Sequence, residues 1–366
     1  MSGQGIPDAR SQSLSGLPEL GSPAVLRHVV DVHCHPTDSE ISQLSMDRLP
    51  ITICAMATRQ ADQGLVRDLA AAHPDKVIPC FGYHPWFTHW ISLAYVSSKR
   101  QHYEELFPNW RENVDAFERL LPLLPSPIPL EDIILDLRQN LEAFPKAMLG
   151  EVGLDRVSRV PFDYFSSPRE LTPFYVPFEH QLAVLEAQIE LAIELGRNIS
   201  VHSVKAQKAT VDLLGRLHLK HGDRWRRLSL DLHSCAFSPQ MWMDVERRHP
   251  NAFLSLSTAI NSRSENHRAL IAACSPHRIL IESDFHCVDE CTERTWAMLL
   301  TVAEIKGWEV ETTWRDDLEE HQWGAVRRLE HNWRVFEKGN HIIPGTQKKG
   351  RRRAQQTEMS VNPLVK

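Results

Sequence analysis

Six side chains of types that bind metal ions stand at the ends of short apolar runs in this chain. Each run is rich in Val, Ile or Leu and ends in a histidine or a carboxylate. Polar groups of this kind are costly to place beside buried strands unless another group compensates them. A pair of divalent cations would compensate all six together, so the pattern predicts a metal-dependent hydrolase. The six candidate ligands are His33, His35, Glu151, His202, His233 and Asp284.

The most compact local motif is His33-Cys34-His35. Alternate side chains of a strand share a face, so the two imidazoles point the same way and Cys34 points oppositely. Two neutral imidazoles on one face suit zinc or another divalent ion. Taken alone, the motif fits two incidental histidines near a strand end equally well.

The other four candidates also have ordinary structural explanations when each is considered alone. Glu151 could bridge two cations or form a salt bridge on a loop, and Asp284 could cap a helix. His202 and His233 each fit a hydrogen-bonded histidine of the core. Independent accidents do not explain why every one of these groups ends its own strand. The joint arrangement therefore favours a dinuclear metal site.

The elements that must position these groups are eight strand-like runs separated by helical stretches. The runs are nearly continuous in apolar character, as in parallel strands covered on both faces. The clearest helix spans 178–195, with one apolar stripe and with Gly196 placed as its C-cap. This alternation predicts an α/β fold of the TIM-type (β/α)8 barrel class, in which the carboxyl ends of all strands meet at one mouth. The predicted strands are 28–35, 51–58, 77–84, 147–153, 198–204, 228–234, 252–258 and 279–284.

The segment 86–146, after the third strand, is too long for a single helix and is predicted to be an insertion. It contains Trp86, Trp90 and Trp110 and an amphipathic piece near 104–121. A second insertion-like loop, 156–175, follows the fourth strand, and both are expected at the rim of the catalytic face. Tryptophans on an exposed face would indicate a protein partner bound through this insertion. Buried tryptophans would indicate ordinary packing.

Composition sets the outer limits of the prediction. The 366 residues are assigned to a disordered leader (1–26), a barrel (27–342) and a basic disordered tail (343–366). No apolar run approaches the roughly 18–20 residues of a membrane span, and no secretory signal is evident. We therefore expect a cytoplasmic or nuclear protein. The net charge of −6 does not itself indicate nucleic-acid binding, although bound cations would supply positive potential locally.

Several motifs together resemble the TatD family of metal-dependent hydrolases, within the amidohydrolase-like superfamily. The resemblance covers about residues 28–338. Its elements are Asp31-Val32-His33-Cys34-His35, Gly82-Tyr83-His84-Pro85, Gly150-Glu151-Val152-Gly153-Leu154-Asp155, the segment from Phe178 to His202, Leu232-His233 followed by Phe237, Glu282-Ser283-Asp284, and Asn332 to Phe336.

The resemblance implies two divalent ions (Zn, Mg or Mn) and cleavage of DNA or another phosphodiester by an activated hydroxide. It implies that His33, His35 and Asp284 hold one ion, that His202 and His233 hold the other, and that Glu151 bridges them. Catalytic roles are expected for Asp284, in proton transfer, and for Glu151. Substrate contacts are expected for His84 and for Lys205.

Three features depart from the family pattern. An Arg-Asp pair usually follows the third ligand strand, whereas this chain has Ser203-Val204-Lys205. The residues after Asp284 are Phe285-His286-Cys287, and compact members lack the 86–146 insertion. These departures spare the ligand set and bear on substrate contacts. A barrel hydrolase of C–N or ester bonds in a small molecule, and a protein-interaction role, are the alternative functions.

Overall fold

The computed structural model describes residues 19–262 and 264–342. Most of the predicted leader and the whole predicted tail lie outside the described residues. Within the leader, the prediction of disorder differs from the structure at α1 (Pro23–Leu26). Val25 and Leu26 are buried in the main core, which explains why this segment is folded.

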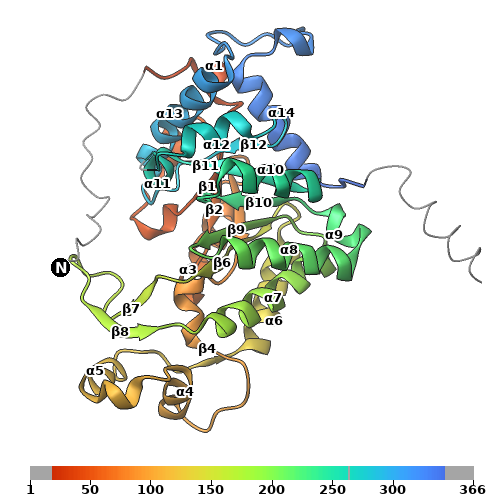
Figure 1. Cartoon of the computed structure of the whole chain (residues 1–366). Helices are drawn as coiled ribbons and strands as arrows, with labels where there is room; N and C mark the ends of the chain where they lie inside the picture. Colours follow the sequence, from red (N-terminus) through yellow and green to blue (C-terminus); the bar gives the residue numbers. More distant parts are fainter. Residues whose placement is uncertain (1–18, 263, 343–366) are drawn as a thin grey trace, which may run out of the picture.

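The centre of the molecule is an eight-stranded parallel sheet in the order β1-β2-β3-β6-β9-β10-β11-β12 (Figure 1). The sheet nearly closes into a barrel. Beyond β12, the Asp284 amide donates to the His33 carbonyl (3.0 Å) and the His35 amide donates to the Phe285 carbonyl (2.8 Å). The predicted barrel class is confirmed. The strands are β1 (Val30–Cys34), β2 (Thr52–Met56), β3 (Val77–Phe81), β6 (Met148–Asp155), β9 (Ile199–Val204), β10 (Leu230–His233), β11 (Ala252–Leu256) and β12 (Ile279–Ile281).

Helices cover the outside of the barrel between successive strands (Figure 1). The helix predicted over 178–195 is found with those bounds, and Gly196 follows it at φ 67°, a left-handed conformation that glycine adopts readily. The larger helices are α3 (Gln60–Ala72), α6 (Leu130–Ala143), α7 (Phe178–Leu195), α8 (Gln207–His221), α10 (Pro239–Arg248), α12 (His267–Ala273), α13 (Val288–Lys306) and α14 (Ala325–Lys338). The shorter ones outside the insertion are α2 (Gln43–Arg48), α9 (Asp223–Arg227), α11 (Thr258–Asn261), η2 (Pro36–Asp38) and η5 (Glu320–Gln322). None of the described helices is at once long enough and apolar enough to cross a membrane.

Helix α14 closes the end of the barrel opposite to the mouth. Trp333 and Phe336 join a core cluster with residues of the barrel strands, such as Phe253 of β11. The Asn332 side chain donates to the Ile279 carbonyl (2.9 Å) at the start of β12. The Asn332-to-Phe336 motif is therefore part of the barrel's floor.

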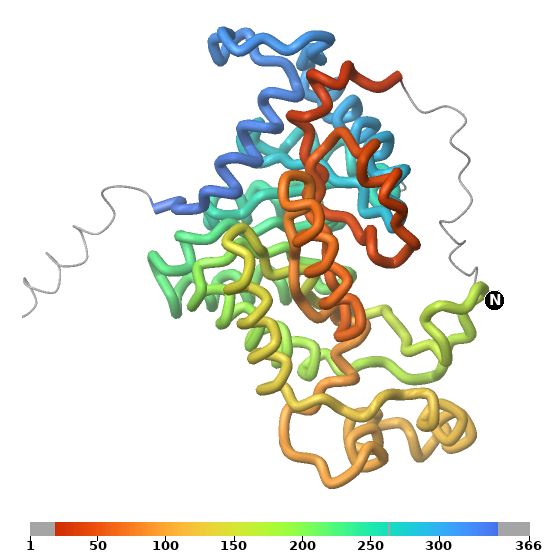
Figure 2. Tube along the Cα trace, turned by 180° about the vertical axis from the view of Figure 1, so that it is seen from behind, coloured from red at the N-terminus to blue at the C-terminus, as the bar shows by residue number. Residues whose placement is uncertain are grey.

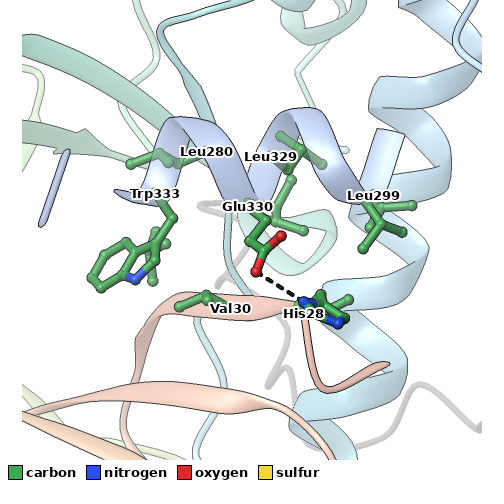
Figure 3. Close-up of a pocket in the computed structure, with 11 residues that line it drawn as sticks. His28, Val30, Leu280, Leu299, Leu329, Glu330 and Trp333 are labelled. Carbon is green, nitrogen blue, oxygen red and sulfur yellow. Dashed lines mark hydrogen bonds and ion pairs between the residues drawn. The ribbon is translucent and has the colours of Figure 1, made fainter. Parts of the chain in front are cut away.

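A small cavity of about 10 Å³ remains beside α14, between β1, β12 and α13 (Figure 3). Such a volume holds one water molecule at most. His28 lies at its edge, 2.8 Å from Glu330, and its ring stacks on Trp314. The floor is thus densely packed and does not form a second binding pocket.

The predicted insertion 86–146 divides into two structural parts. The first contains η3 (Pro85–Trp90), β4 (Ile91–Ser92), α4 (Lys99–Leu106), η4 (Trp110–Glu112), α5 (Val114–Leu120) and β5 (Ile128–Pro129). The second is α6, whose Ile133, Leu137 and Leu141 belong to the main barrel core. The insertion prediction therefore includes the barrel's own helix after β3. The amphipathic piece near 104–121 contains the end of α4 and the whole of α5, which are separated from Pro108 onward, since proline cannot continue a helix.

The insertion and the second loop fold against each other. A β-hairpin, β7 (Arg159–Pro161) with β8 (Leu171–Tyr175), packs beside α4 and α5 (Figures 1 and 2). Tyr103, Phe107 and Phe117 of the insertion share a separate apolar cluster with Val160 and Phe174 of the hairpin. The two loops therefore form one accessory unit.

The tryptophans of the insertion are half-buried and packed. Trp90 and Trp110 lie against the accessory cluster, and Trp86 lies closer to the barrel mouth. They do not form an exposed aromatic face, so they give no support to a protein-binding surface made of tryptophan.

Candidate metal centre

The Glu151 carboxylate lies at the centre of the barrel mouth and is almost fully buried. Its Oε2 atom lies 3.5 Å from Nε2 of His33 and 3.3 Å from Nε2 of His35. Its Oε1 atom lies 2.8 Å from Nδ1 of His202 and 3.1 Å from Nε2 of His233. The two oxygens of one carboxylate thus face two different pairs of imidazoles.

Asp284 follows β12 and adds a second carboxylate to the cluster of Glu151 and its four histidines. Its Oδ1 atom lies 3.5 Å from Nε2 of His35. Its backbone has φ 48°, and the hydrogen bond from its amide to the His33 carbonyl holds it beside β1. The structure therefore brings all six sequence-predicted ligands to one place. Three triads that contain Glu151 or Asp284 have donor atoms within 4.8 Å of one another: His33, His35 and Glu151; His33, His233 and Asp284; and His84, Glu151 and His202.

This convergence follows from the barrel. His33, His35, His233 and Asp284 lie near or beyond the carboxyl ends of β1, β10 and β12, whereas Glu151 and His202 lie midway along β6 and β9. The carboxyl ends of the strands in a parallel barrel meet at one mouth. Gly153 allows β6 to approach β9 closely. A Cβ atom at this position would lie 2.0 Å from the His202 carbonyl oxygen, so any other residue would push the two strands apart. The glycine thus helps to keep Glu151 and His202 in contact.

Neighbouring polar groups orient two of the histidines. Nδ1 of His233 lies 3.1 Å from Oε1 of Glu282, and Nδ1 of His33 lies 2.8 Å from the Ser200 hydroxyl. Because Nδ1 of each ring contacts a group outside the cluster, Nε2 of each ring faces Glu151. Metal-binding histidines are commonly held in this way by an outer carboxylate or other polar group.

His84 also contacts Glu151, with Nε2 3.4 Å from Oε1. Its Nδ1 atom accepts a hydrogen bond from the Trp86 backbone amide (3.1 Å), which assigns the proton of the neutral ring to Nε2. A protonated Nε2 donates hydrogen bonds and cannot ligate a metal ion. The geometry therefore favours His84 as a hydrogen-bond donor beside the centre.

Asp155 supports His202 from behind. Its Oδ2 atom accepts a hydrogen bond from the Trp86 indole (2.7 Å) and lies 3.7 Å from Nε2 of His202. Its Oδ1 atom accepts from the backbone amides of Val157 and Ser158. Asp155 therefore connects the accessory unit, through Trp86, to the barrel mouth.

The electrostatics of the cluster are those of buried carboxylates among imidazoles. Burial alone would raise the pKa of Glu151, but His84, His233 and His33 outweigh it and hold that pKa well below its usual range. The pKa of Asp284 is lowered in the same way, since the hydrogen bond from His35 and the nearby imidazoles outweigh burial. Both groups are therefore anionic at neutral pH.

The histidines respond to the same field in different directions. Burial lowers the pKa of His84 to about 4 and, together with the charge of His233, lowers the pKa of His33. For His35, burial is outweighed by hydrogen bonds to Asp284 and Glu151, which raise its pKa well above the usual range. The imidazoles thus compensate the carboxylates when no cation does so.

The residues fit a divalent cation on two grounds. Nε2 of His33, which faces Glu151, is buried and has no hydrogen-bond partner of ordinary geometry among the described residues. The donor set also mixes imidazole nitrogens with carboxylate oxygens, which suits zinc or manganese.

Lys205, the other predicted substrate contact, is exposed just beyond β9 and has φ 50°. It is near the mouth in the chain but outside the cluster of imidazoles. The residues to which sequence reasoning assigned no role are Asp155, Ser200, Trp86 and Glu282. Ser200 could have been found, because it stands two positions before His202 on one strand and shares its face.

Comparisons with known proteins agree with the fold. Residues 30–316 match the family model described as TatD related DNase. The chain is 32% identical to the Cut9-interacting protein scn1 of Schizosaccharomyces pombe, over 79% of this chain and 96% of that protein. It is 27% identical to the uncharacterized deoxyribonuclease YMR262W of Saccharomyces cerevisiae, over 85% of this chain and 99% of that protein.

Among solved structures, the chain is similar in fold to YJJV, a TatD homologue from Escherichia coli. The TM-score is 0.55 with 18% identity, and the match covers 87% of this chain and 100% of that one.

Proposed function

This chain belongs to the family of TatD-related DNases, and we propose that it hydrolyses phosphodiester bonds of DNA at the centre around Glu151. The observation that carries the proposal is the position of this carboxylate. Its two oxygens face two separate pairs of imidazoles, and Asp284 stands beside one of those pairs. This is the arrangement expected of a carboxylate shared between two cations.

In this proposal His33, His35 and Asp284 would hold one divalent ion, His202 and His233 would hold the other, and Glu151 would serve both. When bound, such ions supply Lewis acidity and lower the pKa of a water molecule toward neutrality. Zinc suits the imidazoles, and Mg²⁺ or Mn²⁺ suits phosphodiester chemistry.

The chain's own groups would perform the proton transfer and the substrate binding. The side chain of Asp284 is partly exposed at the mouth and anionic, so it can accept a proton from a water molecule there. His84 carries its proton on Nε2 and can donate a hydrogen bond from this nitrogen to a phosphate oxygen. Lys205 would add a positive charge at the rim.

The test is a double variant, His33→Ala with Glu151→Ala, assayed on DNA beside a panel of amide and ester substrates. We expect purified wild-type protein to contain divalent metal and to cleave DNA, and the variant to lose both properties. A matched control is His277→Ala with Glu170→Ala, which removes the same residue types from exposed positions. Undiminished DNA cleavage by the double variant would reject this site, and selective hydrolysis of an amide or ester by the wild type would reject the substrate.

A second candidate function is protein binding, favoured by one comparison. The relative with 32% identity is named for interaction with Cut9. In this chain Tyr95 is 93% exposed within the insertion, and Leu123 is also exposed. If the interaction is shared, the chain should bind Cut9 of Schizosaccharomyces pombe, and Tyr95→Ser with Leu123→Ser should weaken binding while leaving DNA cleavage intact.

A further inference from the structure

The tip of the β7–β8 hairpin reaches the loops that follow β2 and β3 at the barrel mouth. The Tyr164 hydroxyl donates to the Trp86 carbonyl (2.8 Å), and the Tyr164 ring packs on Phe87 with centroids 4.7 Å apart. The Phe165 ring lies 5.0 Å from the guanidinium of Arg59. The hairpin tip is thus attached to the mouth and stands one layer of side chains from the candidate metal centre.

Trp86 is that intervening layer. Its ring centroid lies 4.9 Å from that of His84 and 6.5 Å from that of His202. Its indole N–H is fixed by Asp155, and its backbone amide is fixed by His84. The Arg169 guanidinium, from the hairpin, lies 5.8 Å from the centroid of the same indole ring.

The charges around the mouth distinguish Arg169 from the other arginine there. Arg59 is nearly buried and forms ion pairs with Asp38 and Asp62 (both 3.1 Å), so its charge is already balanced. Arg169 is exposed, and no carboxylate within residues 19–262 and 264–342 forms an ion pair with it. The neighbouring Glu170 is instead paired with Arg119 of α5 (3.0 Å).

The mouth itself is rich in acidic groups. The carboxyl groups of Glu151, Asp155 and Asp284 are gathered around the imidazoles of His35 and His202 there. A polyanion that reaches this mouth meets repulsion from any negative charge that bound cations leave uncompensated. A positively charged side chain on the rim reduces that repulsion where a nucleic-acid strand passes beyond the centre.

We propose that Arg169 binds a phosphate that flanks the scissile one, so that the hairpin selects polynucleotides over small phosphodiesters. The inference rests on the proposed function, since it assigns a substrate contact to that same site. The Trp86 ring lies between Arg169 and the imidazoles of the centre. Arg169 would therefore contact a phosphate next to the scissile one, and not the scissile phosphate itself. Phe165, which is 63% exposed on the same tip, presents a face on which a neighbouring base can stack.

The main test compares Arg169→Gln with wild type on two substrates, a fluorescent DNA oligonucleotide and bis(p-nitrophenyl) phosphate. A charge-assisted hydrogen bond to phosphate predicts a loss of about ten- to hundredfold in kcat/KM on the oligonucleotide, mainly through KM. The small diester has no flanking phosphate, so its kcat/KM should change less than about twofold. Arg169→Lys should recover part of the loss. The salt dependence of oligonucleotide binding should decrease by roughly 0.7–0.9 in the log–log slope for the one phosphate contact removed.

Arg111→Gln is the matched control. Arg111 is also exposed and also lies over a tryptophan, Trp110 at 4.9 Å, but that tryptophan packs in the accessory cluster and not against the histidines. The Arg111→Gln substitution should leave kcat/KM unchanged on both substrates. Melting temperature and metal content of Arg169→Gln should equal those of wild type, which separates a binding role from a structural one.

Binding of a phosphorothioate oligonucleotide, measured by fluorescence anisotropy, gives a readout that does not require turnover. If wild type cleaves DNA but Arg169→Gln binds and cleaves it equally well, the inference is wrong and the proposed function stands. Equal losses on both substrates would place Arg169 at the scissile phosphate and also overturn the inference. A loss in Lys205→Gln without one in Arg169→Gln would assign the contact to Lys205. If wild type cleaves no phosphodiester, the proposed function fails. Anisotropy then still decides whether Arg169 binds the polyanion.

Discussion

Glu282 lies behind His233 and selects the ring nitrogen that this histidine presents to Glu151. It is fully buried, and it also accepts hydrogen bonds from the hydroxyls of Ser234 and Ser255. In the sequence it is one more acidic residue near the end of a strand, two positions before Asp284. Its contact with His233 gives it the role of an orienting group.

We expect Glu282→Gln to lower metal affinity by about ten- to hundredfold, because removal of an outer partner of a histidine ligand has effects of that size. The measurement is competition with a chelator of known affinity. Glu330→Gln is the control, since Glu330 also pairs with a histidine, His28 (2.8 Å), but at the floor of the barrel. Equal metal affinity in the Glu282 variant and wild type would show that this pair does not support the centre.

Among the elements, the accessory unit is joined to the barrel through a group of three buried histidines. His89 of η3 lies between α4, which carries His102, and α7, which carries His180. Nε2 of His102 contacts the His89 carbonyl and Nε2 of His180 contacts the Thr88 carbonyl, each at 2.8 Å. Within the part of the chain that the structure describes, the ring nitrogens of His89 have no hydrogen-bond partner of ordinary geometry, although the Trp86 backbone is close enough to favour the charged form of His89.

This arrangement predicts that mild acid weakens the attachment of the accessory unit. Burial, with a smaller contribution from His180, lowers the pKa of His89 to about 3, below the ordinary histidine value of 6.5. The unfolded chain therefore takes up this proton first, so the stability is fully present above about pH 6.5 and is lost progressively as the pH falls toward 3. At pH 5 the loss from this one group is of the order of 2 kcal/mol.

Urea unfolding at pH 7 and pH 5 measures this effect. The drop in unfolding free energy between the two values should be smaller in His89→Gln than in wild type by about that amount. His277→Gln removes an exposed histidine and should leave the drop unchanged. The same pH dependence in His89→Gln and in wild type would show that His89 does not carry it.

At the scale of the whole molecule, closure of the barrel and assembly of the centre are the same event. The backbone hydrogen bonds that join the end of β12 to β1 also place Asp284 next to His33 and His35. The first and last strands are separated by most of the chain, so the centre exists only when the complete barrel is folded. Anything that binds the centre should therefore stabilise the entire fold.

We expect removal of metal with a chelator to lower the melting temperature, and added Zn²⁺ or Mn²⁺ to restore it. An ion present at 100 times its dissociation constant contributes about 2.7 kcal/mol to the folded state. The measurement is differential scanning calorimetry of chelated and reloaded protein. The variant His33→Ala with Glu151→Ala should show no difference between the two conditions. If wild type also shows none, the described centre does not bind these ions.

The barrel and the gathering of the six candidate ligands could be predicted from the sequence. Continuous apolar runs indicated parallel strands buried on both faces, and all eight strands are present. Because the carboxyl ends of parallel strands in a barrel share one mouth, polar residues at those ends had to converge. The ligand roles themselves remain predictions. This part was accessible because periodicity and strand polarity are local properties of the chain.

The partners of those residues were decided by the tertiary structure. Trp86 and Arg169 are 83 positions apart, and only the packing of the insertion against the hairpin places one over the other. The pairing of His233 with Glu282 likewise depends on β10 and β12, which flank β11 in the barrel, facing the same interior. Contacts between loops and between non-adjacent strands depend on three-dimensional distances that no local pattern encodes. For this reason the sequence indicated where the chemistry lies, and the fold determined what surrounds it.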